Sequence, residues 1–517
     1  MVPAAVRPGR FHGGLKLDGH RGLATGTGIV TLPLSERYFL WLGQHHGAAA
    51  TPCVDAGDTV RKGQIIARPE HGQGAPVHAP TSGRVTGFQD VPAPVVRGDS
   101  VPMLVIESDG EDCASGDLPP LDAWETTPRE ALVERIMLAG IVGLGGAVFP
   151  TEVKIRRAGD AVTLILNGAE CEPYISCDDG LMREHARDIL LGARMLLRAL
   201  DSDDCVIAIE RDKPAAIEAM EAALKDLDDG RIRLERIFSL YPAGGERQLI
   251  EALTGRQVPR GGLPQDIGLV CVNVGTAAAV CEAIRDGESL ISRITTVTGP
   301  CIARPGNFRV RIGTPVHELV EAAGGYREPD ARLLMGGPMM GIALEDDRVP
   351  VVKAMNCLLA LPAGEVYSSR EQRACIRCGD CADVCPARLL PQQMYWELRD
   401  KRVESAVEYG LDACIECGCC DVVCPSHLPL TRYFRHGRRQ LGQLAEARAR
   451  AEHTRVRFEA RNARLAAQKA EREARLAAKR EALEAARRRG DHRAAIDEII
   501  ARKKAEAVDG GDPEQSD

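Results

Sequence analysis

Apolar runs of strand length alternate with helix-length amphipathic stretches between Thr127 and Gly287. The strand-like runs are short and rich in aliphatic residues, whereas the helix-like stretches repeat their apolar positions every three or four residues. The runs that predict strands are Val162–Leu166, Cys205–Glu210 and Leu269–Asn273. The stretches that predict helices are Arg129–Ala139, Leu181–Leu200 and Glu246–Leu253, with a further helix entered at Thr276. This alternation predicts a layered α/β domain.

The N-terminal region has shorter apolar runs, which Gly and Pro interrupt. Two of its segments, Val54–Gln64 and Val77–Val85, are similar to the paired halves of a barrel-sandwich hybrid of the biotinyl/lipoyl type. A lipoyl carrier needs an exposed Lys at the hairpin tip, but residues 70–73 of this tip read Glu-His-Gly-Gln. We therefore expect a docking module that carries no lipoyl group.

The C-terminal tail, Leu441–Ala507, consists mainly of Ala, Arg, Glu and Lys. Such a composition can form a solvated helix that is stabilised by ion pairs between residues four positions apart. It lacks the sustained apolar seam of a coiled coil. The tail is interpreted either as an arm that binds a partner or a membrane surface, or as a dispensable charged extension. Asp509–Asp517 should be disordered.

Composition narrows the class of protein. The chain has 517 residues, enough for several domains, and a net charge of −8, which offers no basic face to nucleic acid. Its 18 Cys lack the spacing of a disulfide framework and indicate a reducing compartment. No apolar run approaches the ~20 residues that span a membrane. No apolar run follows the basic N-terminal residues, so we expect no signal peptide.

Two copies of one Cys motif carry the clearest chemistry. Each copy reads Cys-x-x-Cys-x-x-Cys-x-x-x-Cys-Pro. In two-cluster proteins of this pattern, the first three Cys hold one 4Fe-4S cluster and the fourth reaches the other cluster. The predicted ligand sets are Cys375, Cys378 and Cys381 with Cys424, and Cys414, Cys417 and Cys420 with Cys385.

Two structural zinc sites are the alternative, because zinc sites also use Cys-x-x-Cys pairs. The Pro that follows the fourth Cys in both copies favours iron–sulfur clusters. Cys419, which lies beside Cys420, is interpreted as a bystander. Between the two copies, Gln392–Tyr409 has a helical pattern. We therefore expect an all-helical two-cluster domain rather than a compact β-rich ferredoxin.

Four loop segments of the α/β domain carry candidate ligand-binding residues. The Gly-rich loop Gly143–Phe149, with Lys154 after it, offers backbone N–H groups and a cation to a phosphate, although such loops also serve close packing alone. Asn167–Tyr174 follows a strand with an amide and two carboxylates. Gly244–Arg247 opens a helix and Asn273–Thr276 follows a later strand. Loops at these places present ligands in doubly layered folds.

Together and in this order, the loops resemble those of the flavin- and NADH-binding subunit of respiratory complex I and its relatives. The family has a Gly-rich loop ending in Phe-Pro-Thr, an Asn-x-x-Glu-x-Glu-Pro loop, a Gly-Glu pair and an Asn-Val-x-Thr segment, and all four have counterparts here. The resemblance implies a non-covalent FMN. The residues implied to bind it are Gly143, Gly145, Gly146, Lys154, Asn167, Glu170, Gly245, Glu246, Asn273 and Thr276.

The same resemblance implies NAD(H) as the substrate, with catalytic roles for two residues. Nicotinamide would stack near Phe149, and Glu172 would lie close to the ribose or nicotinamide. Two positions depart from the family pattern. Ala169 stands where the family has Asp, and Arg247 stands where a second Glu is common. After the flavin domain, Ser292–Gly341 is similar to the β-grasp ligand-binding module of the same family.

The complete order of regions is similar to that of the RnfC (RsxC) family from ion-translocating electron-transport complexes. The resemblance implies a multidomain α/β and α+β fold. Its regions are a barrel-sandwich hybrid (1–125), an FMN/NADH domain (126–288), a β-grasp module (289–345), a two-cluster ferredoxin-like domain (346–440) and a charged helical or disordered tail (441–517). It also implies a peripheral protein on the cytoplasmic side of the inner membrane.

The implied activity is electron transfer between NAD(H), FMN and two 4Fe-4S clusters. The implied partners are integral and peripheral subunits of the Rnf complex, with ferredoxin as an indirect partner and membrane contact through the partners. Two alternatives stay open. One is a flavoprotein similar to cobalamin reductases, with the same FMN and clusters. The other is a structural electron wire that has lost nucleotide binding, for which Ala169 and Arg247 would be symptoms.

Overall fold

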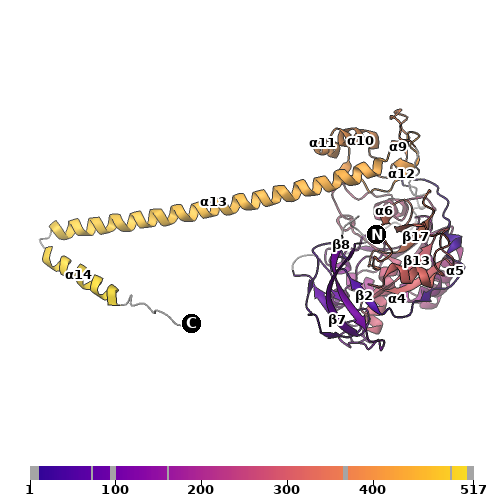
Figure 1. Cartoon of the computed structure of the whole chain (residues 1–517), viewed down its shortest axis with the longest axis horizontal. Helices are drawn as coiled ribbons and strands as arrows, with labels where there is room; N and C mark the ends of the chain where they lie inside the picture. Colours follow the sequence, from indigo (N-terminus) through magenta and orange to yellow (C-terminus); the bar gives the residue numbers. More distant parts are fainter. Residues whose placement is uncertain are drawn as a thin grey trace. The chain divides into compact units, whose positions relative to one another are not determined.

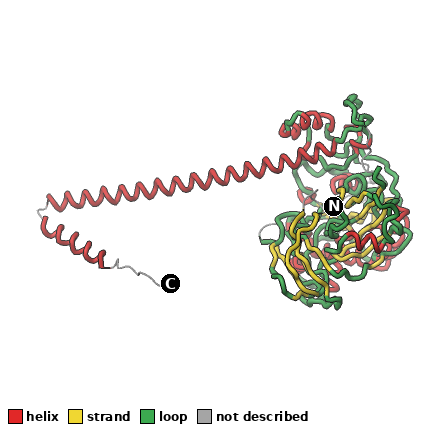
Figure 2. The backbone as a smooth tube through the Cα atoms, in the orientation of Figure 1, coloured by secondary structure: helices red, strands yellow, loops and turns green. Residues whose placement is uncertain are grey.

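The computed structural model describes residues 11–70, 74–93, 100–159, 162–364, 371–488 and 492–508. Residues 71–73 of the predicted hairpin tip and residues 509–517 of the predicted disordered end lie outside the described residues. The chain divides into two units, Met1–Gly437 and Arg438–Asp517, which are described separately. Figure 1 shows the chain with several of its elements labelled, and Figure 2 distinguishes helices, strands and loops.

Two small antiparallel sheets form the N-terminal region, with strand orders β2-β8-β7-β4 and β3-β5-β6. Both sheets contribute aliphatic side chains to one core, as a barrel-sandwich hybrid requires. At the turn into β7, Gly83 is required because a Cβ there would lie 2.0 Å from the carbonyl oxygen of Glu107. The elements are η1 (Arg21–Leu23), β2 (Arg37–Leu40), β3 (Thr51–Pro52), β4 (Thr59–Val60), β5 (Ile65–Arg68), β6 (Val77–His78), β7 (Gly83–Pro92) and β8 (Ser100–Ser108).

The predicted α/β domain contains a parallel sheet with the strand order β11-β10-β9-β12. Its strands are β9 (Thr163–Gly168), β10 (Cys205–Glu210), β11 (Ile232–Ile237) and β12 (Leu269–Asn273). Its helices are α1 (Arg129–Leu138), α2 (Thr151–Arg156), α3 (Cys177–Glu184), α4 (Ala186–Leu200), α5 (Pro214–Leu227), α6 (Glu246–Thr254) and α7 (Val274–Cys281), with η2 (Pro264–Ile267) and η3 (Glu282–Asp286). The chain leaves helical geometry at His185, so the helix expected over Leu181–Leu200 is divided between α3 and α4.

The β-grasp region is built around a sheet with the order β1-β14-β13-β17-β15-β16. Strands from distant parts of the chain complete this sheet, because β1 pairs with β14 and β17 pairs with both β13 and β15. The elements are β1 (Val30–Thr31), β13 (Ser292–Thr298), β14 (Gly306–Arg311), α8 (Val316–Ala322), β15 (Arg332–Met335), β16 (Ile342–Leu344) and β17 (Cys357–Leu361).

In the Cys-rich region, every regular element within the described residues 371–429 is a helix, as expected. Its elements are α9 (Asp380–Asp383), α10 (Pro391–Arg399), α11 (Val403–Glu408), η4 (Leu411–Ala413) and α12 (Cys419–Val422). The single helix expected over Gln392–Tyr409 is instead divided between α10 and α11. The chain turns at Lys401, whose φ of +62° is incompatible with a continuous right-handed helix.

The long helix α13 (Leu430–Arg488) begins in the first unit. The second unit contains the rest of α13 and α14 (His492–Val508). Ion pairs four residues apart, such as Arg455–Glu459 at 2.8 Å and Lys469–Glu473 at 4.0 Å, stabilise α13 as predicted. Among the described residues, no helix combines the length and apolar character needed to cross a membrane.

Candidate functional site

The carboxyl ends of β9 and β12 meet because the two strands are parallel and neighbouring, with Asn167 paired opposite Asn273. The side-chain amide of Asn273 donates to the carbonyl oxygen of Asn167 at 3.4 Å, and its oxygen accepts from the Gly275 N–H at 2.9 Å. This second contact caps α7. The Asn167 amide in turn donates to the Gly244 carbonyl at 2.9 Å. Three of the predicted segments are thus joined by side-chain amides at one edge of the sheet.

The Gly-rich loop lies against the first turn of α7. Thr276 accepts a hydrogen bond from the Leu144 N–H at 2.9 Å, which fixes the middle of the loop. A Cβ on Gly145 would lie 3.5 Å from the Cβ of Asn273. Gly146 has a φ of +105° and is exposed, so its backbone is open to a ligand. The structure thus brings Gly143, Gly145, Gly146, Asn273 and Thr276 together.

Lys154 and Glu246 lie side by side on α2 and α6. The Lys154 amine donates to the Glu246 carboxylate at 2.7 Å and to the Cys271 carbonyl at 3.0 Å. Gly245 immediately precedes α6 and is its N-terminal cap residue. Since Cys271 belongs to β12, which ends at Asn273, this pair lies near the same edge of the sheet. The contacts hold the cation in place for an anionic ligand.

Glu170 faces inward, into a buried charge network. Its carboxylate accepts hydrogen bonds from the Asp178 N–H at 2.9 Å and the Asp179 N–H at 3.3 Å, and it forms an ion pair with Lys213 at 3.3 Å. Burial disfavours the charge on Lys213, but Glu170 and Glu210 outweigh this effect and raise the pKa of Lys213. The Glu170 carboxylate therefore supports the start of α3.

Glu172 also has its carboxylate occupied by the protein. One oxygen accepts from the backbone N–H groups of Met339 and Met340 at 2.8 and 2.9 Å. Burial raises the pKa of Glu172, and these two donors partly counteract the shift. Phe149 is half-buried, and its ring lies 5.3 Å from the ring of His46 in the barrel-sandwich region. Of the two predicted catalytic residues, Glu172 thus contacts the backbone at Met339 and Met340, whereas Phe149 contacts the barrel-sandwich region.

Asp178 is a site residue that sequence reasoning missed. Its carboxylate accepts from the Asn273 amide at 2.7 Å, which brings it to the edge formed by β9 and β12. Burial and the nearby Glu170 raise its pKa to about 7. The available signal was its place, a few residues after the Asn-x-x-Glu-x-Glu-Pro loop and within the first turn of a helix.

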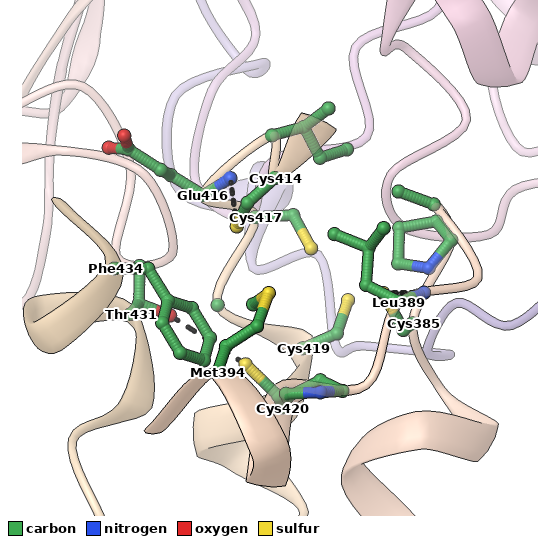
Figure 3. Close-up of a pocket in the computed structure, with 15 residues that line it drawn as sticks. Cys385, Leu389, Met394, Cys414, Glu416, Cys417, Cys419, Cys420, Thr431 and Phe434 are labelled. Carbon is green, nitrogen blue, oxygen red and sulfur yellow. Dashed lines mark hydrogen bonds between the residues drawn. The ribbon is translucent and has the colours of Figure 1, made fainter. Parts of the chain in front are cut away.

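The second predicted ligand set lines one cavity. Cys385, Cys414, Cys417 and Cys420 surround this cavity together with Cys419, and Met394 and Phe434 add apolar walls. Figure 3 shows these sulfur-bearing side chains around the space. A sulfur-rich, apolar cavity suits a 4Fe-4S cluster, which thiolates hold. Because Cys419 lines the cavity too, position alone does not separate it from the predicted ligands.

At the first predicted set, the segments that carry its members also lie side by side. Burial raises the pKa of Cys381, and the neighbouring Cys378 and Cys375 raise it further, so these three thiols lie close together. The Ser426 hydroxyl donates to the Ala374 carbonyl at 2.8 Å, and the Arg373 N–H donates to the Ser426 carbonyl at 2.9 Å. These bonds bring the segment after Cys424 beside the residues that precede Cys375.

Tyr241 connects the flavin-type domain to the Cys-rich region. Its hydroxyl donates to the Cys417 carbonyl at 2.7 Å, and its buried ring packs with Cys417 and Cys419. Cys171, from the loop after β9, packs against the same cluster of side chains. The Gly244 N–H donates to the Cys171 sulfur at 3.2 Å. The candidate flavin loops and the sulfur-lined cavity are therefore parts of one continuous packed region.

Comparison with known proteins identifies the same parts in the same order. Family models match the RnfC barrel sandwich hybrid domain at residues 9–111, the Nuo51 FMN-binding domain at 136–282, the SLBB domain at 294–343 and the 4Fe-4S dicluster domain at 374–428. The fold and site thus define a multidomain protein with an FMN-binding domain and a 4Fe-4S dicluster domain.

Over most of its length the chain is similar to the RnfC family. It is 48% identical over 457 residues to a relative from Pseudomonas aeruginosa that is named as a subunit of an ion-translocating oxidoreductase complex. This alignment covers 88% of this chain and 58% of that relative, so the chain spans less than two thirds of the relative's length. Two solved structures of an NAD+-reducing [NiFe]-hydrogenase are each 20% identical to this chain. The air-oxidised structure has a TM-score of 0.42, and the match covers 55% of this chain and 57% of the hydrogenase chain. The H2-reduced structure has a TM-score of 0.43, and the match covers 63% of this chain and 64% of the hydrogenase chain.

Proposed function

We propose that this chain transfers electrons between NAD(H), an FMN and two 4Fe-4S clusters, as a subunit of an ion-translocating oxidoreductase complex. The observation that carries the proposal is the hydrogen bond of 2.7 Å from Tyr241 to the carbonyl oxygen of Cys417. This bond joins the FMN-binding domain to the cavity lined by Cys residues. A flavin exchanges a hydride with a nicotinamide and exchanges single electrons with iron–sulfur clusters.

The residues at the edge of the sheet fit an FMN. Gly143, Gly145 and Gly146 leave the loop open, Lys154 supplies a cation, and Asn273 and Thr276 fix the loop against α7. Asn167, Gly245 and Glu246 complete the proposed binding set through the contacts described above. In this proposal Glu170 acts through Asp178, because its own carboxylate is bound to α3 and Lys213.

The proposed nicotinamide contacts are Phe149 and Glu172. Phe149 ends the Gly-rich loop, where a half-buried ring can stack on a planar ligand. Glu172 holds the N–H groups of Met339 and Met340, so any contact with a nucleotide requires it to share or release them. The chain's own contribution is to orient the ligand and to exclude water from the sulfur-lined cavity.

We further propose that the chain is peripheral to the inner membrane on its cytoplasmic side, where integral and peripheral Rnf subunits hold it. The 48% identical relative is named as part of an ion-translocating oxidoreductase complex, which supports partners of this kind. Ferredoxin would exchange electrons with the complex indirectly. The helix α13 offers charged residues along its length, and a partner-binding role for this tail belongs to the same proposal.

Iron and flavin analysis of the anaerobically purified chain tests the proposal. We expect about eight irons and about one FMN per chain, since the motif is doubled and each cluster holds four irons. NADH should bleach the flavin absorbance and produce EPR signals of reduced clusters. Zinc in place of iron, or a colourless protein, would contradict the proposal.

The two alternatives give different results in the same preparation. A structural electron wire would contain iron but no flavin that NADH can bleach. A cobalamin-reductase-like flavoprotein would contain both cofactors, but it would not depend on integral partner subunits for membrane association. Fractionation of cells with and without those subunits separates this alternative from the proposed complex.

A further inference from the structure

Cys419 lies among the four Cys of one predicted ligand set, although the Cys motif has a variable residue at its position. That set, which we call the second set, consists of Cys385, Cys414, Cys417 and Cys420. Cys419 is 0% exposed and lines the same cavity as the second set. Figure 3 shows its sulfur pointing into this space. Five thiols therefore border the cavity, one more than a 4Fe-4S cluster takes as ligands.

The Cys419 side chain contacts one member of the second set directly. Its thiol donates a hydrogen bond to the Cys417 sulfur, and the Cys419 backbone N–H donates to the same atom. The two side chains also pack with Tyr241 in one buried cluster. A thiol is a weak donor, but a thiolate that binds metal is a charged and therefore stronger acceptor. Burial also strengthens the bond, because the surroundings have a low dielectric constant.

The internal repeat shows which of these donors is additional. The backbone N–H groups of Leu389 and Leu428 donate to the sulfur of the last Cys in their respective copies, at 3.4 and 3.5 Å. Backbone donors of this kind are thus common to both predicted sets. In the first copy, the counterpart of Cys419 is the exposed Asp380, whose ionised carboxylate has no hydrogen to donate. The second copy therefore gains a side-chain donor that the first copy lacks.

A donor at this position affects the reduction potential of a cluster. Hydrogen bonds to the ligand sulfurs are among the factors that set this potential. Reduction adds one electron, and its negative charge is stabilised by a donor that points at a ligand sulfur. The reduced state gains more from this contact than the oxidised state, so the potential rises. The thiol keeps its proton in both states, and no covalent bond of the chain forms or breaks.

We propose that Cys419 is a positioning residue that acts through Cys417: its thiol donates to this ligand sulfur and thereby raises the reduction potential of the cluster predicted for the second set. The inference rests on the proposed function in one respect, because it takes the second set to hold a 4Fe-4S cluster. It replaces the interpretation of Cys419 as a bystander, and it does not make Cys419 a ligand.

Three substitutions at this position separate hydrogen bonding from packing. Cys419→Ser keeps a donor, Cys419→Val fills a similar volume without a donor, and Cys419→Ala has neither. Each complete chain is purified anaerobically and titrated with dithionite and redox mediators, while EPR follows the clusters. The Val and Ala variants should lower the midpoint potential of one cluster, whereas the Ser variant should keep it near that of the unmodified chain. The iron content should not change in any variant.

Two further variants identify the cluster and provide a matched control. Cys378→Ala removes a predicted ligand of the first set, so the signal that remains belongs to the second set, and the shift caused by Cys419→Ala should persist in this background. Asp380→Ala, at the matched position of the first copy, removes a carboxylate instead of a donor and should lower neither potential. Water that enters beside a cluster would stabilise its more negative reduced state, so a lowered potential is not explained by water entry.

The possible results are distinct. Unchanged potentials in the Val and Ala variants would overturn the inference and leave Cys419 with a packing role. Loss of about four irons from the Ala variant would also overturn it, because Cys419 would then be a ligand. A potential that falls equally in the Ser variant would contradict a role for the donor. Cys419→Ala and Cys419→Ser suffice if the cavity does not accommodate valine.

Reduction by NADH separates this inference from the proposed function. If NADH fails to bleach the flavin, the proposed function fails, and the titration with dithionite still decides the role of Cys419. A chain that binds no iron would overturn both, and metal analysis detects this outcome before any titration.

Discussion

Single side chains at the candidate flavin site hold several segments of the chain at once. Asn273 caps α7, binds the Asn167 carbonyl and donates to Asp178. Thr276 holds Leu144 in the Gly-rich loop. These hydrogen bonds fix the two strand ends and the Gly-rich loop relative to one another. The shape of the candidate site therefore depends on them as well as on the glycines.

Lys154 should contribute to FMN affinity, and Lys154→Met tests this role. Its amine is already held by Glu246 and the Cys271 carbonyl, so it can bind a phosphate without first being ordered. A charged hydrogen bond contributes about 1.5–3 kcal/mol, so we expect FMN to bind roughly tenfold to a hundredfold more weakly. Fluorescence titration of flavin-depleted protein measures the affinity.

Arg156→Met is the matched control for this measurement. Arg156 lies on the same short helix but pairs with Glu130 and Glu152 at the surface. Its loss should leave FMN affinity unchanged. Equal weakening by both substitutions would show that the net charge of α2, rather than the position of Lys154, controls binding.

The sequence predicted which segments lie together at the candidate site, but not the direction in which every side chain points. Asn167 and Asn273 could be placed together because both follow strands of one parallel sheet. Glu170 and Glu172 could not, because their partners Lys213 and Met339 come from distant segments. Their burial in protein contacts depends on tertiary packing, which motif spacing does not report.

At the scale of elements, the close packing of α4 on α7 positions the start of α7. A Cβ on Gly192 of α4 would lie 1.9 Å from the Ala277 carbonyl oxygen of α7. Only Gly permits this approach. Asn273 caps α7 and Thr276 lies in its first turn, so the spacing between α4 and α7 also determines where these two residues of the candidate site lie.

Gly192→Ala should therefore lower both stability and FMN affinity. Overpacking of a buried contact costs about 1–3 kcal/mol, and the displaced α7 would move Thr276 away from the Gly-rich loop. Thermal unfolding and FMN titration measure the two effects. Gly442→Ala serves as the control, because no atom lies within 4 Å of a Cβ there and the substitution favours a solvated helix. A thermally neutral Gly192→Ala chain would contradict the packing argument.

Strands were predicted more accurately than helix ends. The predicted bounds of Cys205–Glu210 and Leu269–Asn273 are those of β10 and β12. Two predicted helices are each divided in the structure, at His185 and at Lys401. The apolar period continues across both breaks, so periodicity alone could not reveal a change of backbone direction.

At the scale of the whole molecule, the division of the chain into two units after Gly437 predicts that the second unit is not needed for cofactor binding. The first unit contains every predicted cofactor ligand and the buried start of α13. A chain that stops after Gly437 should keep its iron and FMN content. A chain that stops before Leu430 removes Thr431 and Phe434, which line the cavity surrounded by Cys385, Cys414, Cys417 and Cys420, and should lose the cluster that these Cys residues are predicted to hold. Metal analysis and EPR compare the two, and iron loss in the longer chain would contradict the prediction.

Lys353 predicts a pH dependence of stability at the junction of three regions. Its buried amine donates to the Pro76 carbonyl at 3.2 Å and the Gly140 carbonyl at 2.8 Å. Burial lowers its pKa from 10.5 to about 7. Above pH 7 the unfolded chain therefore binds a proton that the folded chain lacks, so stability should rise with pH by roughly 2 kcal/mol between pH 7 and pH 9.

Comparison of slopes tests this prediction. Lys353→Met removes the titrating group, so its unfolding temperature should rise less with pH than that of the unmodified chain. Lys225→Met, at an exposed position on α5, should keep the unmodified slope. Parallel curves for all three proteins would show that Lys353 does not produce the effect.

The segment Phe11–Leu17 lies between Tyr241 and Val384. The Leu15 N–H donates to the Tyr241 carbonyl at 2.8 Å, and the Gly14 N–H donates to the Val384 carbonyl at 3.0 Å. Leu15 and Leu17 pack against the cluster that contains Cys417 and Cys419. A protease cut or a bulky purification tag that displaces this segment would therefore open a path for dioxygen to these two sulfur atoms. Tags placed after the tail therefore suit isolation in air better than tags placed at the amino end.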